Sequence, residues 1–369
     1  MTTPTAADAA PALPSWGLCI ATYNRADYLK VCVGHVLAQT RPPAQIVIVD
    51  SSDDWAATAE AVRALVAAAP GVALDYLPSA VRSSTVQRNV GIAALATDVV
   101  FVIDDDTFMY SDCAERLLAH YAADADGALV GLCAVNTPAP PPAAGERVGG
   151  EQAPRLVRKD TGRRRLGAFG RAVLRTRLGA WFSRTVLVQS KAGLFIRYDD
   201  RAPAPLPPAL AGRNLTPVAF MPGFAMTARR SVTGRESFDQ ALRYYAAFED
   251  LDVSYRYGRH GALALARDAR VHHFEAKSGR IAAKKVIIFQ LLNMAVFLRR
   301  HAARPDEMFA AYRWLLWRRL LGETLKDLIA GRLGLPQAAG VLFVMRRWRL
   351  IRDLPVDRID AWYPDFQKE

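Results

Sequence analysis

The sequence lacks the patterns that would assign it to a protein class at once. Its four cysteines form no CxxC pair, so neither a zinc site nor a disulfide framework is indicated, and a reducing compartment is favoured. No GxGxxG follows the first predicted strand and no GxxxxGKS/T occurs, so the usual dinucleotide and P-loop signatures are missing. There is no basic start with an apolar segment behind it, and no run of about 18 uncharged apolar residues. We therefore expect no signal peptide and no spanning helix, and a cytoplasmic location.

The sequence is instead rich in apolar residues and in positive charge. Of its 369 residues, 51% are hydrophobic, which is typical of a globular protein with one large core or two smaller ones. Lysine and arginine number 48 against 36 acidic residues, and the formal charge of +12 indicates an anionic partner such as nucleic acid, anionic lipid or a phosphorylated substrate. Residues 1–14 cannot bury a core, and we expect them to be a disordered tail.

From residue 16 onward, apolar strands alternate with helical patterns. Runs of β-branched apolar residues predict strands buried on both faces, and each run is followed by apolar residues at helical spacing. The predicted strands cover 17–21, 46–49, 72–77 and 99–103, and the predicted helices cover 27–37, an Ala-rich stretch up to 69, and 85–94. This order predicts an α/β fold with a doubly wound, mostly parallel sheet and a ligand site at the carboxyl ends of its strands.

Three carboxylates follow the fourth predicted strand directly: Asp104, Asp105 and Asp106. They would repel one another at the edge of a sheet unless a cation, a proton or hydrogen bonds compensated them. Alternation along the strand sends Asp104 and Asp106 to one side, which suits one divalent ion and the diphosphate that it holds. The structural alternative is an acidic turn that caps the next helix, as Asp112 is expected to do in front of Cys113.

The sequence beyond this strand is more broken. A helix over 112–121 and a strand over 128–134 lead into a Pro/Gly loop over 136–154. Residues 155–184 then hold ten Lys or Arg against a single acid. That segment is either a solvated flap or an electropositive rim over a phosphate site.

A second acidic segment, 248–256, predicts the start of a helix. Its carboxylates lie in the first helical turn, where the helix dipole favours negative charge. Two short edge strands are predicted after it, over 263–266 and 269–273. The adjacent His272 and His273 should point to opposite faces of the second strand, so at most one of them can share a site with the Asp cluster.

Seven short segments of the chain follow one another in a recognisable order: ATYNR, IVIVDSS, VQRNVGI, VIDDD, GFAM, FED and VHH. As an ordered set, covering about residues 16–275, they resemble the inverting nucleotide-sugar glycosyltransferases of family 2, which have the GT-A fold. The resemblance implies a GT-A domain over 15–280 with a Rossmann-like nucleotide-binding half. It also implies an inverting transferase of the hexosyl type.

The resemblance also implies roles for individual residues. In the family the first two strand ends hold the nucleoside, and Ser51 stands where many members have a second Asp. Asp106 matches the metal contact, as does His273, with the preceding His left open. Asp250 matches the general base, and Glu249 its neighbour or a clamp on the acceptor. The residues implied to bind the nucleotide sugar are Thr22, Tyr23, Asn24, Arg25, Asp50, Ser51, Arg88, Asp104 and Asp105.

The chemistry of such a transfer requires these residue types independently of the resemblance. Displacing a nucleoside diphosphate from an anomeric carbon builds negative charge on the leaving phosphate, which a divalent ion neutralises as a Lewis acid. The acceptor hydroxyl must lose its proton, so a carboxylate is required across the sugar. Oxygen ligands suit Mg²⁺ or Mn²⁺, and a His ligand favours Mn²⁺. The expected donor is a nucleoside-diphosphate sugar, with a UDP-sugar favoured, and the expected acceptor is a saccharide or lipid-linked saccharide in bacterial surface polysaccharide synthesis.

Two alternative functions fit parts of the sequence. A metal-dependent sugar-phosphate nucleotidyltransferase would use the same carboxylates, but it would need basic residues around a triphosphate and no base after a GFAM-type segment. A catalytically inactive membrane-binding protein with the same fold would depend on residues 281–369, which predict a basic, Trp-rich helical extension.

In this extension Trp314, Trp317 and Trp348 are interleaved with Arg. Rings at the headgroups and Arg for anionic lipid are what an interfacial helix needs, which would place the protein peripherally on the inner face of the plasma membrane. The same pattern is expected if the helices pack on the catalytic domain with Arg stems covering apolar surface. No RNA or DNA fold signature accompanies these aromatics, so nucleic acid is not an expected partner.

Overall fold

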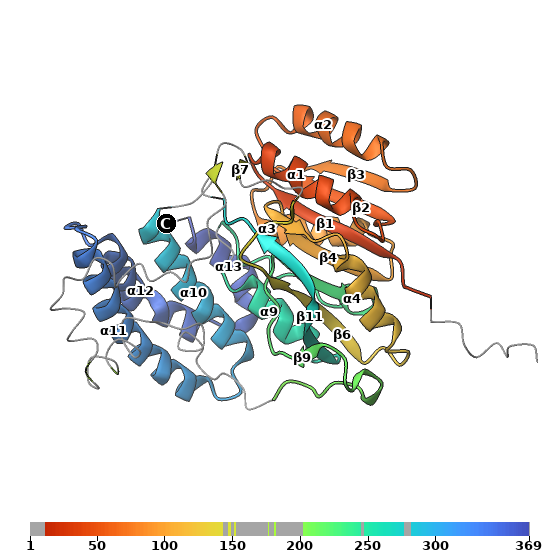
Figure 1. Ribbon diagram of the computed structural model, residues 1–369. Coiled ribbons are helices and arrows are strands. Elements are labelled where there is room, and N and C mark those ends of the chain that lie inside the picture. The colour runs from red at the N-terminus through yellow and green to blue at the C-terminus, as the bar shows by residue number, and fades with distance from the viewer. Residues whose placement is uncertain are drawn as a thin grey trace, which may run out of the picture. The chain divides into compact units, whose positions relative to one another are not determined.

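The computed structural model is shown in Figure 1. It describes residues 12–142, 147–148, 151–152, 176, 181, 202–244, 247–276 and 282–368. The described chain divides into two compact units. The α/β unit holds 12–142, 147–148, 151–152, 202–239 and 249–276, and the helical unit holds 240–244, 247–248 and 282–368. Of the predicted tail only residues 12–14 are described, and Leu13 packs against the core of the α/β unit. The basic segment 155–184 lies outside the described residues except for positions 176 and 181.

The first half of the α/β unit is a sheet of four parallel strands, as predicted. In spatial order they are β3 (Ala73–Pro78), β2 (Gln45–Asp50), β1 (Trp16–Thr22) and β4 (Val99–Asp104), connected by α1 (Ala26–Leu37), α2 (Trp55–Ala67) and α3 (Ser84–Ala94). Successive side chains alternate between two apolar clusters. Leu18 and Ile20 join the cluster that contains α1 and α2, whereas Cys19 joins the cluster that contains α3. Helices therefore cover both faces of the sheet, which confirms the doubly wound arrangement (Figure 1).

The strand register brings three chain segments together at one edge of this sheet. Thr22 pairs with Asp50, and Ala21 pairs with Asp104. The ends of β1, β2 and β4 therefore lie next to one another, as expected for parallel strands. This edge is where ligands bind in open α/β sheets, because the chain leaves the sheet there in loops that helices do not cover.

The second half of the sheet is mixed. β10 (Met226–Arg229) runs antiparallel to β4 and to β6 (Leu129–Asn136), and β11 (Ala262–His273) runs parallel to β6. β5 (Thr107–Met109) and β9 (Leu215–Pro217) pair antiparallel with different parts of β11. The prediction of two short edge strands is wrong here, because β11 is one 12-residue interior strand with a register shift between Ala266 and Arg270. The exposed Arg267 at this shift interrupts the apolar alternation, which made the segment look like two strands.

Short elements complete the α/β unit. They are α4 (Cys113–Ala122), the hairpin of β7 (Arg147–Val148) and β8 (Glu151–Gln152), the 3-10 helix η3 (Pro208–Leu210), α8 (Arg230–Thr233) and α9 (Glu249–Tyr257). The hairpin lies inside the segment predicted to be loop throughout, which corrects that prediction. Asp112 precedes α4 but makes no capping hydrogen bond through its side chain, and it pairs instead with Arg116 at 3.3 Å.

The helical unit contains four α-helices and one 3-10 helix within its described residues. They are α10 (Ala283–His301), α11 (Pro305–Ile329), α12 (Pro336–Asp353), η4 (Val356–Arg358) and α13 (Ile359–Phe366). A buried polar residue, Asn293, organises the core: its amide donates to the carbonyl of Ala247 at 2.9 Å, and its Oδ1 atom accepts from Tyr363 at 2.6 Å and Gln367 at 3.2 Å. Among the described helices, none combines the length and the apolar character needed to cross a membrane.

The three tryptophans predicted for an interface separate into two environments. Trp348 belongs to the core, with its ring centroid 5.7 Å from that of Phe309 and 5.9 Å from that of Tyr312. The prediction of an interfacial position is therefore wrong for Trp348. Trp314 and Trp317 on α11 are 66% and 55% exposed, respectively.

Candidate active site

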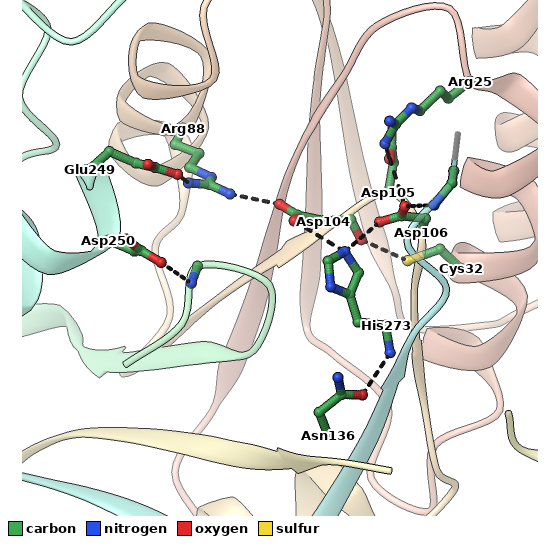
Figure 2. A network of polar contacts seen from close by, with 12 residues as sticks. Arg25, Cys32, Arg88, Asp104, Asp105, Asp106, Asn136, Glu249, Asp250 and His273 are labelled. Carbon is green, nitrogen blue, oxygen red and sulfur yellow. Dashed lines mark hydrogen bonds and ion pairs between the residues drawn. The ribbon is translucent and has the colours of Figure 1, made fainter. Parts of the chain in front are cut away.

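Two carboxylates and one imidazole converge where β4 and β11 end. Asp104 closes β4, Asp106 follows in the turn to β5, and His273 closes β11. One ligand atom from each of the three side chains lies within 4.8 Å of the other two. The Nε2 atom of His273 is 3.2 Å from Asp106 Oδ1 and 3.8 Å from Asp104 Oδ2 (Figure 2). Asp104 and Asp106 thus share one side, as predicted, although a turn rather than a continued strand brings them there.

This cluster has the ligand set of a divalent-metal site. Asp106 is 2% exposed, and its buried Oδ1 atom faces the His273 imidazole, with Nε2 3.2 Å away. A buried carboxylate is costly unless cationic groups or a bound cation compensate its charge. Burial raises the pKa of Asp106, but His273, Arg25 and the backbone N–H of Ala276 outweigh it and leave the pKa below its ordinary value. Two carboxylates and an imidazole fit Mn²⁺ or Mg²⁺, and the imidazole favours Mn²⁺.

Asp105 faces away from the metal cluster. It is 4% exposed and accepts hydrogen bonds from the Thr22 hydroxyl at 2.7 Å and from the Arg25 guanidinium at 3.1 Å. Burial and the neighbouring Asp106 raise the pKa of Asp105 to about 7, against the opposing effect of Arg25. These contacts tie the end of β1 to the acidic turn. The nucleotide-sugar contact that the resemblance implies for Asp105 stays a prediction.

His273 is held in place by its ring and by its backbone. The ring of Phe224 stacks on the imidazole with centroids 4.5 Å apart and an interplanar angle of 17°. The backbone N–H of His273 donates to Asn136 Oδ1 at 3.0 Å. Burial lowers the pKa of His273, but Asp106 and then Asp104 outweigh it, and the net pKa is raised. The imidazole is therefore fixed in orientation before any ligand arrives.

The two adjacent histidines face opposite sides of β11, as predicted. His272 is fully buried, with its Nδ1 atom 3.0 Å from the carbonyl oxygen of Thr137 and its ring centroid 6.4 Å from that of Phe108. His273 faces the carboxylates. The sequence left open which of the two histidines lies beside the carboxylates, and in the structure it is His273.

Arg88 joins the acidic cluster to a second group of carboxylates (Figure 2). It is 3% exposed and donates to Asp104 Oδ1 at 2.7 Å and to Glu249 Oε1 at 3.0 Å. Burial would lower the pKa of Arg88, but Asp104 and Glu249 raise it well above its ordinary value, so the guanidinium stays charged. Helix α3 reaches this position because Gly91 packs on β1, where a Cβ would lie 2.5 Å from Cys19 Sγ. A larger residue there would displace the helix that carries Arg88.

Glu249 and Asp250 open helix α9, as predicted. Asp250 accepts a hydrogen bond on Oδ2 from the Gly223 N–H at 3.3 Å and one on Oδ1 from the Leu251 N–H at 2.9 Å. A Cβ at Gly223 would lie 3.2 Å from the Arg88 guanidinium, so glycine lets this loop pass close to both Arg88 and Asp250. Burial and the charge of Asp250 raise the pKa of Glu249 to about 8, against the opposing effect of Arg88. Glu249 therefore holds its proton at neutral pH in the absence of ligand.

The ends of β1 and β2 present a second polar surface. Asn24 has a left-handed backbone, with φ of 51°, and its side chain exchanges two hydrogen bonds with Asp53, at 2.8 and 3.1 Å. Arg82 pairs with Asp53 and lies over the Tyr23 ring, with its Cζ atom 4.6 Å from the centroid. An open hollow of about 540 Å³, lined by residues of α1, α2 and the loops before them, lies beside this surface. The aromatic ring, the guanidinium and the carboxylate are within reach of solvent.

Asp50 and Ser51 lie behind this surface. Asp50 is fully buried, and its carboxylate accepts hydrogen bonds from the Tyr76 hydroxyl and from the Ser52 N–H. Ser51 is 6% exposed, and its N–H donates to a carbonyl at the end of β1. The direct ligand contacts of Asp50 and Ser51 implied by the resemblance stay a prediction. The exposed carboxylates of this loop are Asp53 and Asp54, and Asp53 lies two residues beyond the position that the family pattern marks.

Residues 18–185 match the sequence profile described as Glycosyl transferase family 2. This part of the chain is therefore similar to family 2 glycosyltransferases. The matched range includes the ends of β1, β2 and β4 and helix α3, and therefore the sheet edge where the candidate site begins. The chain's mixed α/β sheet with helices on both faces agrees with the GT-A fold. No curated protein sequence matches the chain.

Three solved structures resemble this chain at low sequence identity. GalNAc-T7 with UDP, GalNAc and Mn²⁺ has a TM-score of 0.50 at 13% identity, over 95% of this chain and 59% of that chain. The mannosyltransferase PcManGT from Pyrobaculum calidifontis, in complex with GDP-Man and Mn²⁺, has a TM-score of 0.48 at 15% identity, over 98% of this chain and 91% of that chain. TarS 1–349 from S. aureus has a TM-score of 0.46 at 11% identity, over 96% and 91%. GalNAc-T7 therefore shares the fold with this chain.

Several contacts of the site were not predicted. The Arg88–Glu249 ion pair joins residues 161 positions apart, and nothing in either segment indicates the other. Phe224 lies in the GFAM segment, and the position of that segment in the sequence does not indicate that the ring stacks on His273. A signal for Asp53 was present, since the loop after the second strand holds three Asp, but the family pattern drew attention to the earlier positions.

Proposed function

We propose that the protein transfers a hexosyl group from a nucleoside-diphosphate sugar, with a UDP-sugar as donor, to a hydroxyl of a saccharide or lipid-linked saccharide with inversion at the anomeric carbon. One observation carries the proposal. Arg88 bridges Asp104 of the candidate metal cluster and Glu249 beside the candidate base, so the groups that a displacement needs on its two sides belong to one site (Figure 2). The acceptor class is that expected in bacterial surface polysaccharide synthesis.

The donor end of the site is supplied by the α/β sheet edge. We assign Asp104, Asp106 and His273 to a bound divalent ion, Mn²⁺ or Mg²⁺, which when present neutralises charge on the leaving diphosphate. Tyr23 and Arg82 offer flat surfaces for a nucleobase, and exposed polar groups of the same loops can accept the hydroxyls of a ribose. Until the donor arrives, Arg25, Arg88 and His273 pair with the carboxylates of the acidic turn.

The acceptor end is assigned to Asp250. A base must accept the hydroxyl proton as the bond to the anomeric carbon forms, so its carboxyl group has to be ionised at the pH of the reaction. Glu249 is engaged by Arg88, and its pKa of about 8 keeps it protonated at neutral pH, which makes it the poorer base. Asp250 accepts hydrogen bonds from two backbone N–H groups, which set the direction of its carboxylate. Glu249 is then free to donate a hydrogen bond to the acceptor.

The decisive experiment is transfer and donor binding measured on one preparation of Asp250→Asn. A base acts in the transition state and contributes little to holding the donor, so turnover should fall by roughly 10²-fold or more while donor affinity stays nearly intact. Affinity for nucleotide sugars would be measured by calorimetry with Mn²⁺, and the anomeric configuration of the product by NMR. Asp126→Asn, which changes an exposed carboxylate outside the site, is the matched control. Loss of donor binding in Asp250→Asn would move this residue to the metal site, and retention of configuration would refute inversion.

A metal-dependent nucleotidyltransferase is the competing assignment for the same carboxylates. It predicts release of pyrophosphate from a nucleoside triphosphate and a sugar 1-phosphate. The proposed transferase predicts instead release of a nucleoside diphosphate from a nucleotide sugar. Incubation of the protein with each donor pair and Mn²⁺, followed by phosphorus NMR, separates the two.

A further inference from the structure

Helix α11 carries an exposed apolar stripe on the face opposite its core contacts. Trp314, Trp317, Leu321 and Leu328 are 66%, 55%, 48% and 51% exposed. Their spacings of three, four and seven residues place them along one side of a helix. Leu333, in the turn after α11, is 86% exposed and extends the apolar surface beyond the helix end. We call these five residues the α11 stripe.

The stripe is not needed to hold the helical unit together. The opposite face of α11 supplies the buried residues, among them Phe309, Tyr312 and Leu316, and it packs on α10 and α12. A helix in an ordinary globular position has one apolar face and one polar face. Helix α11 is apolar on both, so the outer face is explained only by a second apolar or interfacial environment.

The charge around the stripe has one sign. Residues 282–368 contain sixteen Lys or Arg and eight Asp or Glu. Between residues 308 and 352 the only two acids, Glu323 and Asp327, are buried. The exposed charged residues of that range are all basic, and they are Arg313, Arg332, Arg346 and Arg349. The exposed charge of this part of the helical unit is therefore positive, although Arg332 also pairs with Asp327 at 3.6 Å.

We propose that the α11 stripe is a lipid-docking surface, with α11 lying in the plane of an anionic membrane. Its Trp rings suit the headgroup level and its Leu side chains the outer acyl region, while Arg313 and its basic neighbours contact lipid phosphates. A second copy of the chain fits the stripe poorly, because pairing two such faces would bring like charges together. The helix is too polar on its remaining surface to cross the bilayer, so the contact is peripheral. The proposal does not depend on the transferase assignment.

Flotation with vesicles tests the proposal on the full chain. Phosphatidylcholine vesicles with and without phosphatidylglycerol would be mixed with the protein and separated by density. The wild type should float with the anionic vesicles only, and less so at high salt. The double variant Trp314→Ser/Trp317→Ser should lose at least roughly tenfold in partitioning, because two interfacial rings are removed. Arg313→Gln/Arg346→Gln should weaken binding to anionic vesicles as well, since it removes charge and leaves the rings.

The control is Trp55→Ser, which removes an exposed Trp, 37% exposed, from α2 of the other unit and should bind vesicles as the wild type does. Circular dichroism melts of all variants check folding, and sedimentation velocity checks the oligomeric state. Unchanged flotation of the Trp double variant would overturn the proposal, as would equal binding to neutral vesicles. A self-association that the double variant abolishes would assign the stripe to a second copy instead. Failure of sugar transfer with intact flotation would count against the proposed function alone.

Discussion

Two sites of the protein, one in each unit, place arginine and tryptophan in opposite environments. In the α/β unit Arg88 is buried between two carboxylates, and Trp16 is buried in the sheet core. On α11 of the helical unit Arg313 and Trp314 both face solvent. A buried charge must be paired, so Arg88 fixes a polar site, whereas exposed rings beside unpaired Arg fit a surface that is covered only when a partner arrives. The same residue types thus indicate chemistry in one unit and attachment in the other.

The largest expected effect lies in the polar site of the α/β unit. Asp106→Ala removes the buried carboxylate of the candidate metal cluster, so binding of Mn²⁺ and Mn²⁺-dependent binding of the donor should both be lost. Asp105→Asn should retain Mn²⁺ affinity and lower the melting temperature, because Asp105 is bonded to Thr22 and Arg25. Mn²⁺ binding followed by electron paramagnetic resonance and thermal melts would be recorded on both. Near-wild-type metal binding in Asp106→Ala would remove the metal assignment.

The second prediction separates two tryptophans of the helical unit. Trp348→Ala empties a core position stacked on Phe309, so the free energy of unfolding should fall by about 3–5 kcal/mol. Trp314→Ala removes an exposed ring and should change stability by no more than about 0.5 kcal/mol. Urea unfolding followed by circular dichroism measures both. Equal losses would mean that the outer face of α11 is covered within the protein, and the contrast between the units would disappear.

The sequence predicted the elements of the α/β unit better than those contacts that join distant segments. The strands at 17–21, 46–49 and 99–103 were found because buried parallel strands are continuous apolar runs. The pairing of Arg88 with Glu249 was not found, because a local pattern carries no information about a partner 161 residues away. Likewise the motif around Asp50 does not reveal that its buried carboxylate accepts a hydrogen bond from the Tyr76 hydroxyl on the neighbouring strand.

In the helical unit, the spacing of apolar residues does indicate that Trp348 lies in the core. Val341, Val344, Trp348 and Ile351 are buried, and their spacings of three, four and three are those of one helix face. The interleaved Arg residues drew attention to the polar side of the same helix. Trp314 and Trp317 fall outside the buried face of α11, which includes Tyr312 and Leu316. The helical period of the apolar residues, together with the position of each Trp within that period, therefore distinguishes a core Trp from an exposed one.

The third prediction concerns the pH dependence of stability in the polar site. The pKa of Glu249 is raised to about 8 in the folded protein, against about 4.3 in an unfolded chain. A raised carboxyl pKa favours folding below the unfolded pKa, and this stability is lost as the pH rises through the folded pKa. The Glu249→Gln variant has no carboxyl group to ionise at this position, so it does not lose this stability. Its free energy of unfolding relative to the wild type should therefore rise from about pH 5 to about pH 8. Chemical unfolding of both proteins across this range gives the difference, and a constant difference would contradict the raised pKa.

The smallest effect is expected from Phe224, which acts on the metal only through His273. The stacked ring fixes the imidazole beside Asp106 without touching a ligand position, so its loss should loosen the ligand and leave the ligand set unchanged. An aromatic pair is worth about 0.5–1.5 kcal/mol, so Phe224→Leu should weaken Mn²⁺ binding by roughly two- to tenfold. Phe224→Tyr keeps the ring and should restore the affinity, which a role in general packing would not require.

The matched control comes from the helical unit, where Phe343 lies beneath the Arg347 guanidinium at 3.9 Å. Phe343→Leu removes a comparable ring contact, and it should leave Mn²⁺ affinity unchanged while shifting the melting temperature slightly. Mn²⁺ titrations by electron paramagnetic resonance would compare Phe224→Leu, Phe224→Tyr and Phe343→Leu. If Phe224→Tyr is impaired as much as Phe224→Leu, the ring does not orient His273, and the imidazole must be held by Asn136 and the carboxylates alone.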